Sequence, residues 1–395
     1  MKYFSSDIIF PGHLSPVENG ILVVDDTGVI FELLDPSLME IPDSIEVEYF
    51  PGILCPGFVN SHCHLELSHM KGMLQQKQTL TAFVEEFISK RGLRPDEVQP
   101  AAIAADAEMY ANGIVAVGDI SNAKDSIAVK KQSKMYYHTF VELFDIDPDR
   151  AVLVFENGKK LMNEFASAGL RASIVPHAPY TVTEKLFDLI ASYSAENENL
   201  LCIHNQETES EDTMFRNGSG RLYGTIKKFS RSLDGWKPPG VSSLSYILNK
   251  FKSPGNFQLV HNTFTQPNDL SKAVQRRGNL YWCICPKANL FIEDRLPDIR
   301  MMKDLGCRLT VGTDSYASNF TLSILDELKI IAKYFPDIRA EEMIRWVTIN
   351  GAAFLGIEAK YGSFEKGKQP GILHIHSMKD VVKCFDSESI VRRVV

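Results

Sequence analysis

Two histidines separated by one residue, His62 and His64, follow an apolar run of the chain. Because side chains alternate between the two faces of a β-strand, both imidazoles of such a pair point to the same side and can bind one metal ion. His204 offers a third nitrogen, and Asp314 offers a carboxylate oxygen. This donor set leaves a position open for water, as a catalytic zinc site requires. We therefore predict a metal site made of His62, His64, His204 and Asp314.

Catalysis at such a site also needs groups that move protons. A bound metal ion lowers the pKa of its water towards about 7. Asp314 is suited to accept the proton of that water, and Glu207, three residues beyond His204, can carry a proton to the substrate. His261 can hold or polarise the attacking hydroxide. We therefore predict Glu207, His261 and Asp314 as the catalytic residues.

The elements that must position these residues alternate along the chain from residue 53 onward. Eight β-branched or aromatic runs are each followed by a longer stretch, most with helical periodicity. The predicted strands span residues 53–62, 113–120, 135–143, 170–177, 200–205, 257–262, 279–285 and 308–314. The predicted helices include residues 95–112, 149–168, 183–195, 267–277, 297–305, 322–334 and 340–355.

This alternation predicts an α/β fold, namely a (β/α)8 TIM barrel. Active sites in this architecture lie at the C-terminal ends of the strands, and histidine or aspartate ends five of the eight predicted strands. No G-x-G-x-x-G or P-loop motif follows a strand, which argues against dinucleotide and nucleoside triphosphate sites.

The two ends of the chain have a different pattern, with short strands and turn residues between them. These strands are predicted at residues 7–10, 20–25, 28–33, 45–50, 371–376 and 390–395. We expect both ends to form one small β-sandwich domain. The predicted boundaries are 1–52 for its N-terminal part, 53–356 for the barrel and 357–395 for its C-terminal part.

Residues 56–64, Pro-Gly-Phe-Val-Asn-Ser-His-Cys-His, resemble the P-G-[FL]-[VI]-N-x-H-x-H signature of the amidohydrolase superfamily. Later motifs resemble one branch of it, which holds cytosine, guanine, adenosine-type and S-adenosylhomocysteine deaminases and triazine chlorohydrolases. These motifs are His204-x-x-Glu207, His261, Cys285-Pro286-Lys287-Ala288-Asn289-Leu290 and Gly312-Thr313-Asp314-Ser315. The resemblance covers nearly the whole chain in the right order. It implies the same metal ligands, with Glu207 and His261 as acid–base residues.

One departure from the superfamily pattern concerns the number of metal ions. Binuclear members carry a lysine at the end of the fourth strand, whereas this chain has His177 there. We therefore expect one divalent transition metal ion per chain. Imidazole and carboxylate ligands suit several such ions, so zinc is expected and iron is possible.

The resemblance implies a hydrolytic deaminase that acts on an aminated nitrogen heterocycle. Residues 62–67, His-Cys-His-Leu-Glu-Leu, are similar to deaminases of adenosine derivatives such as aminodeoxyfutalosine, so we expect a purine nucleoside-like substrate. His177, Glu66 and His69 follow strand ends and are predicted to bind it. Two alternatives remain open. One is a chlorohydrolase or cyclic amidohydrolase with the same metal, and the other is an inactive barrel that acts as a binding protein.

Composition limits the partners. The net charge is −8, which argues against a nucleic-acid or membrane surface because either would favour a basic face. Neither a signal peptide nor an apolar stretch of membrane-spanning length is visible. The seven cysteines are odd in number and lie mostly in apolar runs, which favours reduced thiols and a cytoplasmic location. We further expect a homo-oligomer, namely a dimer.

Overall fold

The computed structural model describes residues 1–40, 45–197, 199–229, 233, 236–252, 255–276, 279–377 and 385–395. Two four-stranded sheets, each parallel throughout, form its centre. The first holds, in this order, β6 (Phe58–Cys63), β7 (Ile114–Ser121), β8 (Tyr136–Leu143) and β9 (Arg171–Pro176). The second holds β10 (Leu201–Asn205), β11 (Phe257–His261), β12 (Leu280–Ile284) and β13 (Arg308–Val311).

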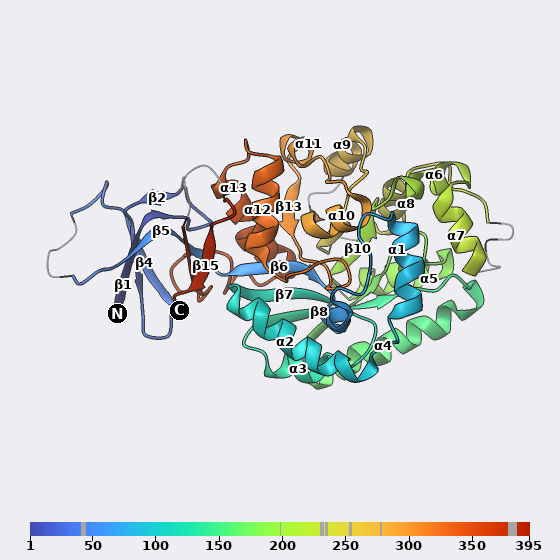
Figure 1. The fold of residues 1–395 in the computed structure, drawn as a ribbon, viewed down its shortest axis with the longest axis horizontal. Helices are drawn as coiled ribbons and strands as arrows, with labels where there is room; N and C mark the ends of the chain where they lie inside the picture. The colour runs from blue at the N-terminus through green and yellow to red at the C-terminus, as the bar shows by residue number, and fades with distance from the viewer. Residues whose placement is uncertain are drawn as a thin grey trace.

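The two sheets approach each other at both edges. Beside β6 and β13, Cys63 forms a parallel bridge with Asp314, and the Thr313 amide donates to the His62 carbonyl at 3.1 Å. Beside β9 and β10, the His204 amide donates to the His177 carbonyl at 2.9 Å. With helices around the outside of the strands, the arrangement is of the TIM-barrel type (Figure 1).

Strand periodicity decides which side chains face the interior. In β10, Leu201 and Ile203 join the large apolar cluster that includes the surrounding helices. Cys202 instead joins a separate cluster with residues of four other strands, namely Val59, Phe140, Val175 and Tyr281. His204 lies two residues beyond Cys202, so period-2 alternation places its imidazole on the same inner face.

The helices between the strands pack on them through apolar stripes. In α5 (Glu184–Glu196), the Thr183 hydroxyl caps the first turn, and Leu186, Phe187 and Ile190 are buried. The other helices of this outer layer are α2 (Val98–Ala111), α3 (Ile127–Gln132), α4 (Ala151–Ser167), α8 (Ser243–Lys250), α9 (Pro267–Arg276), α11 (Ile299–Asp304), α12 (Ile324–Tyr334), α13 (Ala340–Arg345) and α14 (Gly351–Leu355). A π-helical segment, Trp346–Asn350, joins α13 to α14.

Further helices lie in the loops that follow the C-terminal ends of strands. They are the 3-10 turns η1 (Leu65–Met70), η2 (Pro95–Glu97) and η3 (Pro148–Arg150), and the helices α1 (Leu80–Lys90), α6 (Glu209–Asn217), α7 (Arg221–Phe229) and α10 (Pro286–Glu293). None of α1, α6, α7 and α10, nor α3 and α8 of the outer layer, is among the helices predicted from the sequence.

The second to eighth predicted strands are confirmed. Each end agrees within one residue, except that β13 ends at Val311 rather than at 314. Asp314 has a φ of 56°, so the backbone has left the strand before it. The predicted helix 267–277 corresponds to α9, and its last residue lies outside the described part of the chain.

The first predicted strand, 53–62, is wrong as a single element, because the run divides between two sheets. Its first half belongs to β5 (Glu48–Pro56), which pairs with strands from the chain ends, and its second half is β6. The chain changes sheet at Gly57, where an added Cβ would lie 2.2 Å from Val115 Cγ1. Both halves are buried, so hydrophobicity alone does not mark the division.

Strands from both chain ends share one seven-stranded sheet, at the left of Figure 1 with both termini beside it. Its order is β15-β14-β5-β1-β3-β4, and β2 pairs with β1. The strands are β1 (Lys2–Ile9), β2 (Val17–Glu18), β3 (Ile21–Val24), β4 (Ile30–Leu34), β5, β14 (Ile372–His376) and β15 (Ile390–Arg393).

In the described residues, the two chain ends form a single sheet rather than the two sheets of the expected sandwich. Ile8 and Ile53 on one side of this sheet belong to the same apolar cluster as the barrel helices. Phe4, Leu22 and Leu54 belong to a second, smaller cluster. The barrel therefore buries one side of the sheet, which is the role that a second sheet has in a sandwich.

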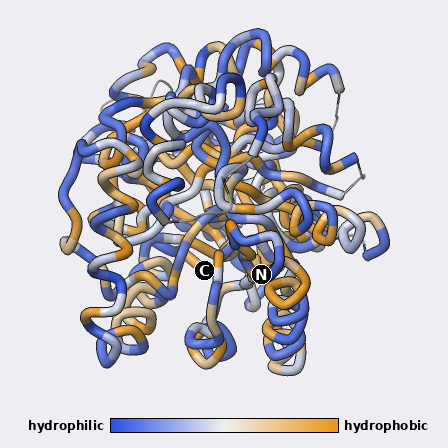
Figure 2. The backbone as a smooth tube through the Cα atoms, turned by 90° about the vertical axis from the view of Figure 1, so that its right-hand side faces the viewer, coloured by the Kyte–Doolittle hydropathy of each residue, from blue (hydrophilic) through white to orange (hydrophobic). Residues whose placement is uncertain are grey.

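Hydrophobic segments gather towards the middle of the molecule, while the peripheral loops are mostly hydrophilic (Figure 2). Among the described residues, no helix is both long and apolar enough to cross a membrane. The six described cysteines are free thiols, and Cys384 lies outside the described residues.

Candidate metal centre

A cavity of about 620 Å³ opens at the C-terminal ends of the strands. His64, His204, Glu207, His261 and Asp314 all line it, although they come from four different segments of the chain. Parallel strands end on the same side of a barrel, so residues far apart in the sequence meet there. The cavity is thus the place where the predicted chemistry has to occur.

Three imidazoles converge at the bottom of this cavity. Nε2 of His62 lies 3.1 Å from Nε2 of His64, and both rings offer a nitrogen within 4.8 Å of one from His204. Burial lowers the pKa of His64 to about 4 and that of His62 well below its ordinary value. Neutral imidazoles present lone pairs, and lone pairs that face one another repel unless a cation lies between them. The donor set therefore fits a divalent transition metal ion.

Asp314 completes this group, which we call the candidate metal centre: His62, His64, His204 and Asp314. Its Oδ1 lies 3.4 Å from Nε2 of His64 and 3.7 Å from Nε2 of His62. Its Oδ2 accepts a hydrogen bond from the Ser318 hydroxyl. One carboxylate oxygen thus faces the imidazoles while the other holds the side chain in place.

The hydrogen bond of His204 determines which of its nitrogens can bind metal. Its Nδ1 lies 2.8 Å from the carbonyl oxygen of His177, so Nδ1 carries the proton and donates it. The lone pair is then on Nε2 alone. Glu142, His177 and His204 also offer donor atoms within 4.8 Å of one another. Because His204 has one lone pair, it cannot serve this group and the candidate metal centre at once, which favours a single ion.

Glu207 and His261 lie side by side at the edge of the candidate metal centre. Glu207 Oε1 is 3.7 Å from Nε2 of His261. Burial, reinforced by the charge of Asp314, raises the pKa of Glu207 well above its ordinary value. The backbone amide of Glu207 donates to buried Glu211 at 3.3 Å. Burial thus favours the protonated form of this carboxyl group, and a protonated carboxyl group is suited to general acid catalysis.

Backbone strain is concentrated at these strand ends. Gln206, His261, Asn262 and Asp314 have φ values of 46°, 72°, 57° and 56°. Non-glycine residues rarely adopt such angles, and they persist where the surrounding structure enforces them. Here the bends turn side chains from the strand direction towards the cavity.

Of the three residues predicted to bind substrate, one lines the cavity. His177 does so, with its Nδ1 2.7 Å from the hydroxyl of Thr181 and a pKa that burial lowers to about 4. Glu66 and His69 are buried in η1 and are not among the lining residues. Glu66 accepts the backbone amides of Asn122 and Ala123, so its oxygens are already used within the protein.

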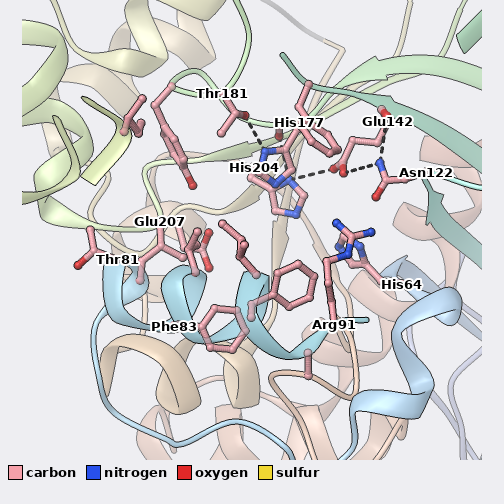
Figure 3. Close-up of a pocket in the computed structure, with 18 of the residues that line it drawn as sticks. His64, Thr81, Phe83, Arg91, Asn122, Glu142, His177, Thr181, His204 and Glu207 are labelled. Atoms are coloured by element: carbon pink, nitrogen blue, oxygen red, sulfur yellow. Dashed lines mark hydrogen bonds and ion pairs between the residues drawn. The ribbon is translucent and has the colours of Figure 1, made fainter. Parts of the chain in front are cut away.

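The sequence analysis missed Glu142, which ends the third barrel strand, and Asn122, which donates to it. Both line the cavity, and Figure 3 shows them beside His204. The sequence signal for Glu142 is an acidic residue within the apolar run 135–143, a strand that ends in neither histidine nor aspartate.

One wall of the cavity is apolar and comes from loop helices. The helix α1 contributes Phe83, Val84, Phe87 and Ile88, with Arg91 just after it, while α7 contributes Leu222 and Ile226. Figure 3 shows Phe83 and Arg91 across the cavity from Glu142. The candidate metal centre therefore forms one side of a mixed cavity that suits an organic substrate.

Comparison with known proteins gives the same fold. An aminodeoxyfutalosine deaminase from Deinococcus radiodurans is 26% identical over 90% of this chain and 86% of its own. The crystal structure of Helicobacter pylori aminofutalosine deaminase with methylthio-coformycin has a TM-score of 0.80 at 21% identity, covering 94% of this chain and 91% of that chain. An adenosine deaminase from Xanthomonas campestris, solved with bound zinc, has a TM-score of 0.73 at 20% identity, covering 94% and 84%.

The signature that contains His62 and His64 lies near the start of the matched region, and Asp314 lies towards its end. Residues 53–392, most of the chain, match the model of one family, so with its barrel and its converging histidines the chain belongs to the amidohydrolase family.

Proposed function

We propose that this protein is a metal-dependent hydrolytic deaminase of an aminated nitrogen heterocycle, most specifically of a purine nucleoside-like compound. The observation that carries the proposal is the buried carboxyl group of Glu207, whose Oε1 lies 3.7 Å from Nε2 of His261 beside the candidate metal centre. Relatives named as deaminases of adenosine derivatives match this chain over most of their length, which supports the same reaction class here.

In the proposed reaction, water adds to the amino-bearing ring carbon, ammonia leaves, and a carbonyl remains. His62, His64, His204 and Asp314 would hold one divalent ion, for which zinc is the first candidate and iron the second. When bound, the ion makes water acidic enough to be a nucleophile near neutral pH. The loss of the C–N bond then depends on proton transfers by the protein.

Each proton transfer has a residue in reach. Asp314 accepts the proton of the attacking water, and His261 hydrogen-bonds that water from the opposite side. Glu207 gives its proton to the ring nitrogen next to the reacting carbon, so that negative charge does not build up on the ring. Asp314 then passes the proton that it took from the water to the amino group, which leaves as ammonia, and the remaining hydroxyl proton returns to Glu207 as the carbonyl forms. Chloride would leave without such a proton. The chain has all four predicted metal ligands together with Glu207 and His261, which argues against an inactive barrel.

The architecture carries a related proposal: the two four-stranded sheets close into one (β/α)8 barrel. Support comes from the hydrogen bonds at both sheet edges and from the interior cluster that both sheets share. We propose domains close to 1–52, 53–356 and 357–395. The pairing of β5 up to Pro56 supports moving the first boundary to Gly57.

An ammonia-release screen tests the proposed function. The purified protein, its metal content measured, is incubated with aminated purines, pyrimidines and their nucleosides, and the Glu207→Gln variant serves as the matched control. Ammonia release from at least one purine nucleoside, abolished in the variant, is expected. Release of chloride from chlorinated heterocycles with no ammonia from any amine would contradict the proposal.

A further inference from the structure

The carboxylate of Glu142 has an oxygen without a hydrogen-bond donor among the described residues. Glu142 lies in β8, lines the cavity, and has a side chain only 4% exposed. Nδ2 of Asn122 donates to its Oε2 at 3.1 Å and to its backbone carbonyl at 3.0 Å, but Oε1 accepts nothing. Buried carboxylate oxygens are nearly always paired, so this one indicates a ligand that brings the donor.

His204 is the nearest donor, and it is already engaged. Its Nδ1 is 3.5 Å from Glu142 Oε1 but 2.8 Å from the His177 carbonyl oxygen, so its proton goes to the carbonyl. Figure 3 shows Glu142 between Asn122 and His204. Oε1 is thus left without a hydrogen bond, in a side chain that lines the cavity.

His177 offers a second acceptor beside the first. The Thr181 hydroxyl donates to the Ala178 carbonyl at 3.3 Å, so its oxygen accepts the Nδ1 proton of His177. The remaining ring nitrogen, Nε2, then carries a lone pair. A nitrogen of His177 and an oxygen of Glu142 lie within 4.8 Å of each other. Two acceptors so close together match two donors on neighbouring atoms of one ligand.

We propose that Glu142 is a specificity-determining residue that, with His177, accepts hydrogen bonds from the vicinal hydroxyls of a ribonucleoside. This inference rests on the proposed function, because it places the base at the candidate metal centre and the sugar beside β8. A second metal ion is a poor occupant, since His204 has no lone pair to give it and two ligands alone hold an ion weakly. A diol satisfies both acceptors without a charge.

The test compares two substrates that differ only in these hydroxyls, adenosine and 2′,3′-dideoxyadenosine. The wild-type enzyme should prefer adenosine in kcat/KM by roughly tenfold to a hundredfold, because the analogue leaves a buried carboxylate unpaired. In Glu142→Gln, Asn122 retains the amide oxygen and the amide NH2 faces the hydroxyls. The charge-assisted hydrogen bond is then replaced by a weaker one from the neutral NH2 to a hydroxyl oxygen, so the preference should fall by at least about threefold, with the metal content unchanged.

The matched control is Asp145→Asn, because Asp145 lines the same cavity but both its oxygens have partners, the Asp147 amide at 2.8 Å and Arg150 at 3.4 Å. It should affect both substrates equally. A Glu142→Gln enzyme that keeps the preference overturns the inference. Loss of the metal in that variant also overturns it, because Glu142 would then serve the metal centre through His204.

A binding measurement separates this inference from the proposed function. Affinities for both nucleosides are measured by calorimetry in Glu207→Gln, with and without Glu142→Gln. If adenosine binds with the Glu142-dependent preference but the wild-type enzyme releases no ammonia from any amine, the deaminase proposal fails and the sugar site stands. If neither nucleoside binds, both fail.

Discussion

At the residue scale, hydrogen bonds assign a separate task to each acid and base around the cavity. His204 gives its Nδ1 proton to a backbone carbonyl, which leaves Nε2 for a metal ion. Asp314 is held through its Oδ2 by Ser318, so Oδ1 faces the imidazoles. Glu207 lies beside His261, and burial raises the pKa of its carboxyl group well above the ordinary value. Burial raises the pKa of both carboxyl groups, but at Asp314 the hydrogen bond from Ser318 opposes the rise.

Glu207→Gln should retain the metal ion and lower turnover by about a hundredfold or more, which is the scale of general acid catalysis. Glutamine has the same shape but no acidic proton to give to the ring nitrogen. Steady-state ammonia release and elemental analysis check the two halves of this prediction. Normal turnover, or loss of the ion, would mean that Glu207 has another role.

Glu66→Ala should cost stability rather than substrate selectivity. The variant leaves the amides of Asn122 and Ala123 without their acceptor, and an unpaired buried donor costs about 1–3 kcal/mol. Urea unfolding measures the loss of free energy, and kcat/KM for a nucleoside and its free base measures selectivity. A much larger loss on the nucleoside than on the base would restore Glu66 as a sugar contact.

At the scale of elements, a buried ion pair joins β7, α3 and the turn after β6. Lys130 Nζ lies 2.6 Å from Asp119 Oδ2, and both side chains are fully buried. Asp119 Oδ1 also accepts the amide of Leu65 at 2.7 Å, directly after His64. This pair ties the turn that carries His64 to the neighbouring strand, so it positions a metal ligand from outside the cavity.

Lys130→Met should therefore destabilise the protein by about 3–5 kcal/mol, because it leaves the Asp119 carboxylate buried without a cation. The double variant Lys130→Met/Asp119→Asn removes both charges and should recover a large part of that loss. Chemical denaturation of the three proteins gives the comparison. A single variant as stable as the wild type would show that the pair contributes nothing to the fold.

At the scale of the whole molecule, an ion at the candidate metal centre would join both barrel sheets, through ligands from β6 and the residue after it, from β10 and from the segment after β13. Removing it with a chelator should abolish activity and lower Tm, because a ligand that binds only the folded state stabilises it. Re-addition of about one equivalent of zinc should restore both. Elemental analysis that finds two tightly held ions per chain would contradict the single-ion prediction.

The homodimer expected from the sequence is still a prediction at this scale. Sedimentation velocity on the metal-loaded protein measures it directly. A single species at the mass of one chain, over a tenfold concentration range, would rule it out.

The sequence by itself was enough for seven barrel strands and for grouping the histidines and Asp314 of the candidate metal centre. Strand period and strand-end position are local properties, and parallel topology brings strand ends together whatever the loops do. That is why a shared site for His62, His204 and Asp314 could be predicted from the amino-acid sequence.

Only the tertiary structure decided where the apolar run 53–62 divides and which polar residues reach the cavity. Gly57 separates two sheets because Val115 leaves no room for a side chain there, and that neighbour is distant in sequence. Glu66 follows a metal ligand yet bonds to backbone amides, whereas Glu142 lies within a strand and keeps a free oxygen in the cavity. Past the end of a strand the alternation of side chains no longer applies, so their direction depends on neighbours that folding brings together.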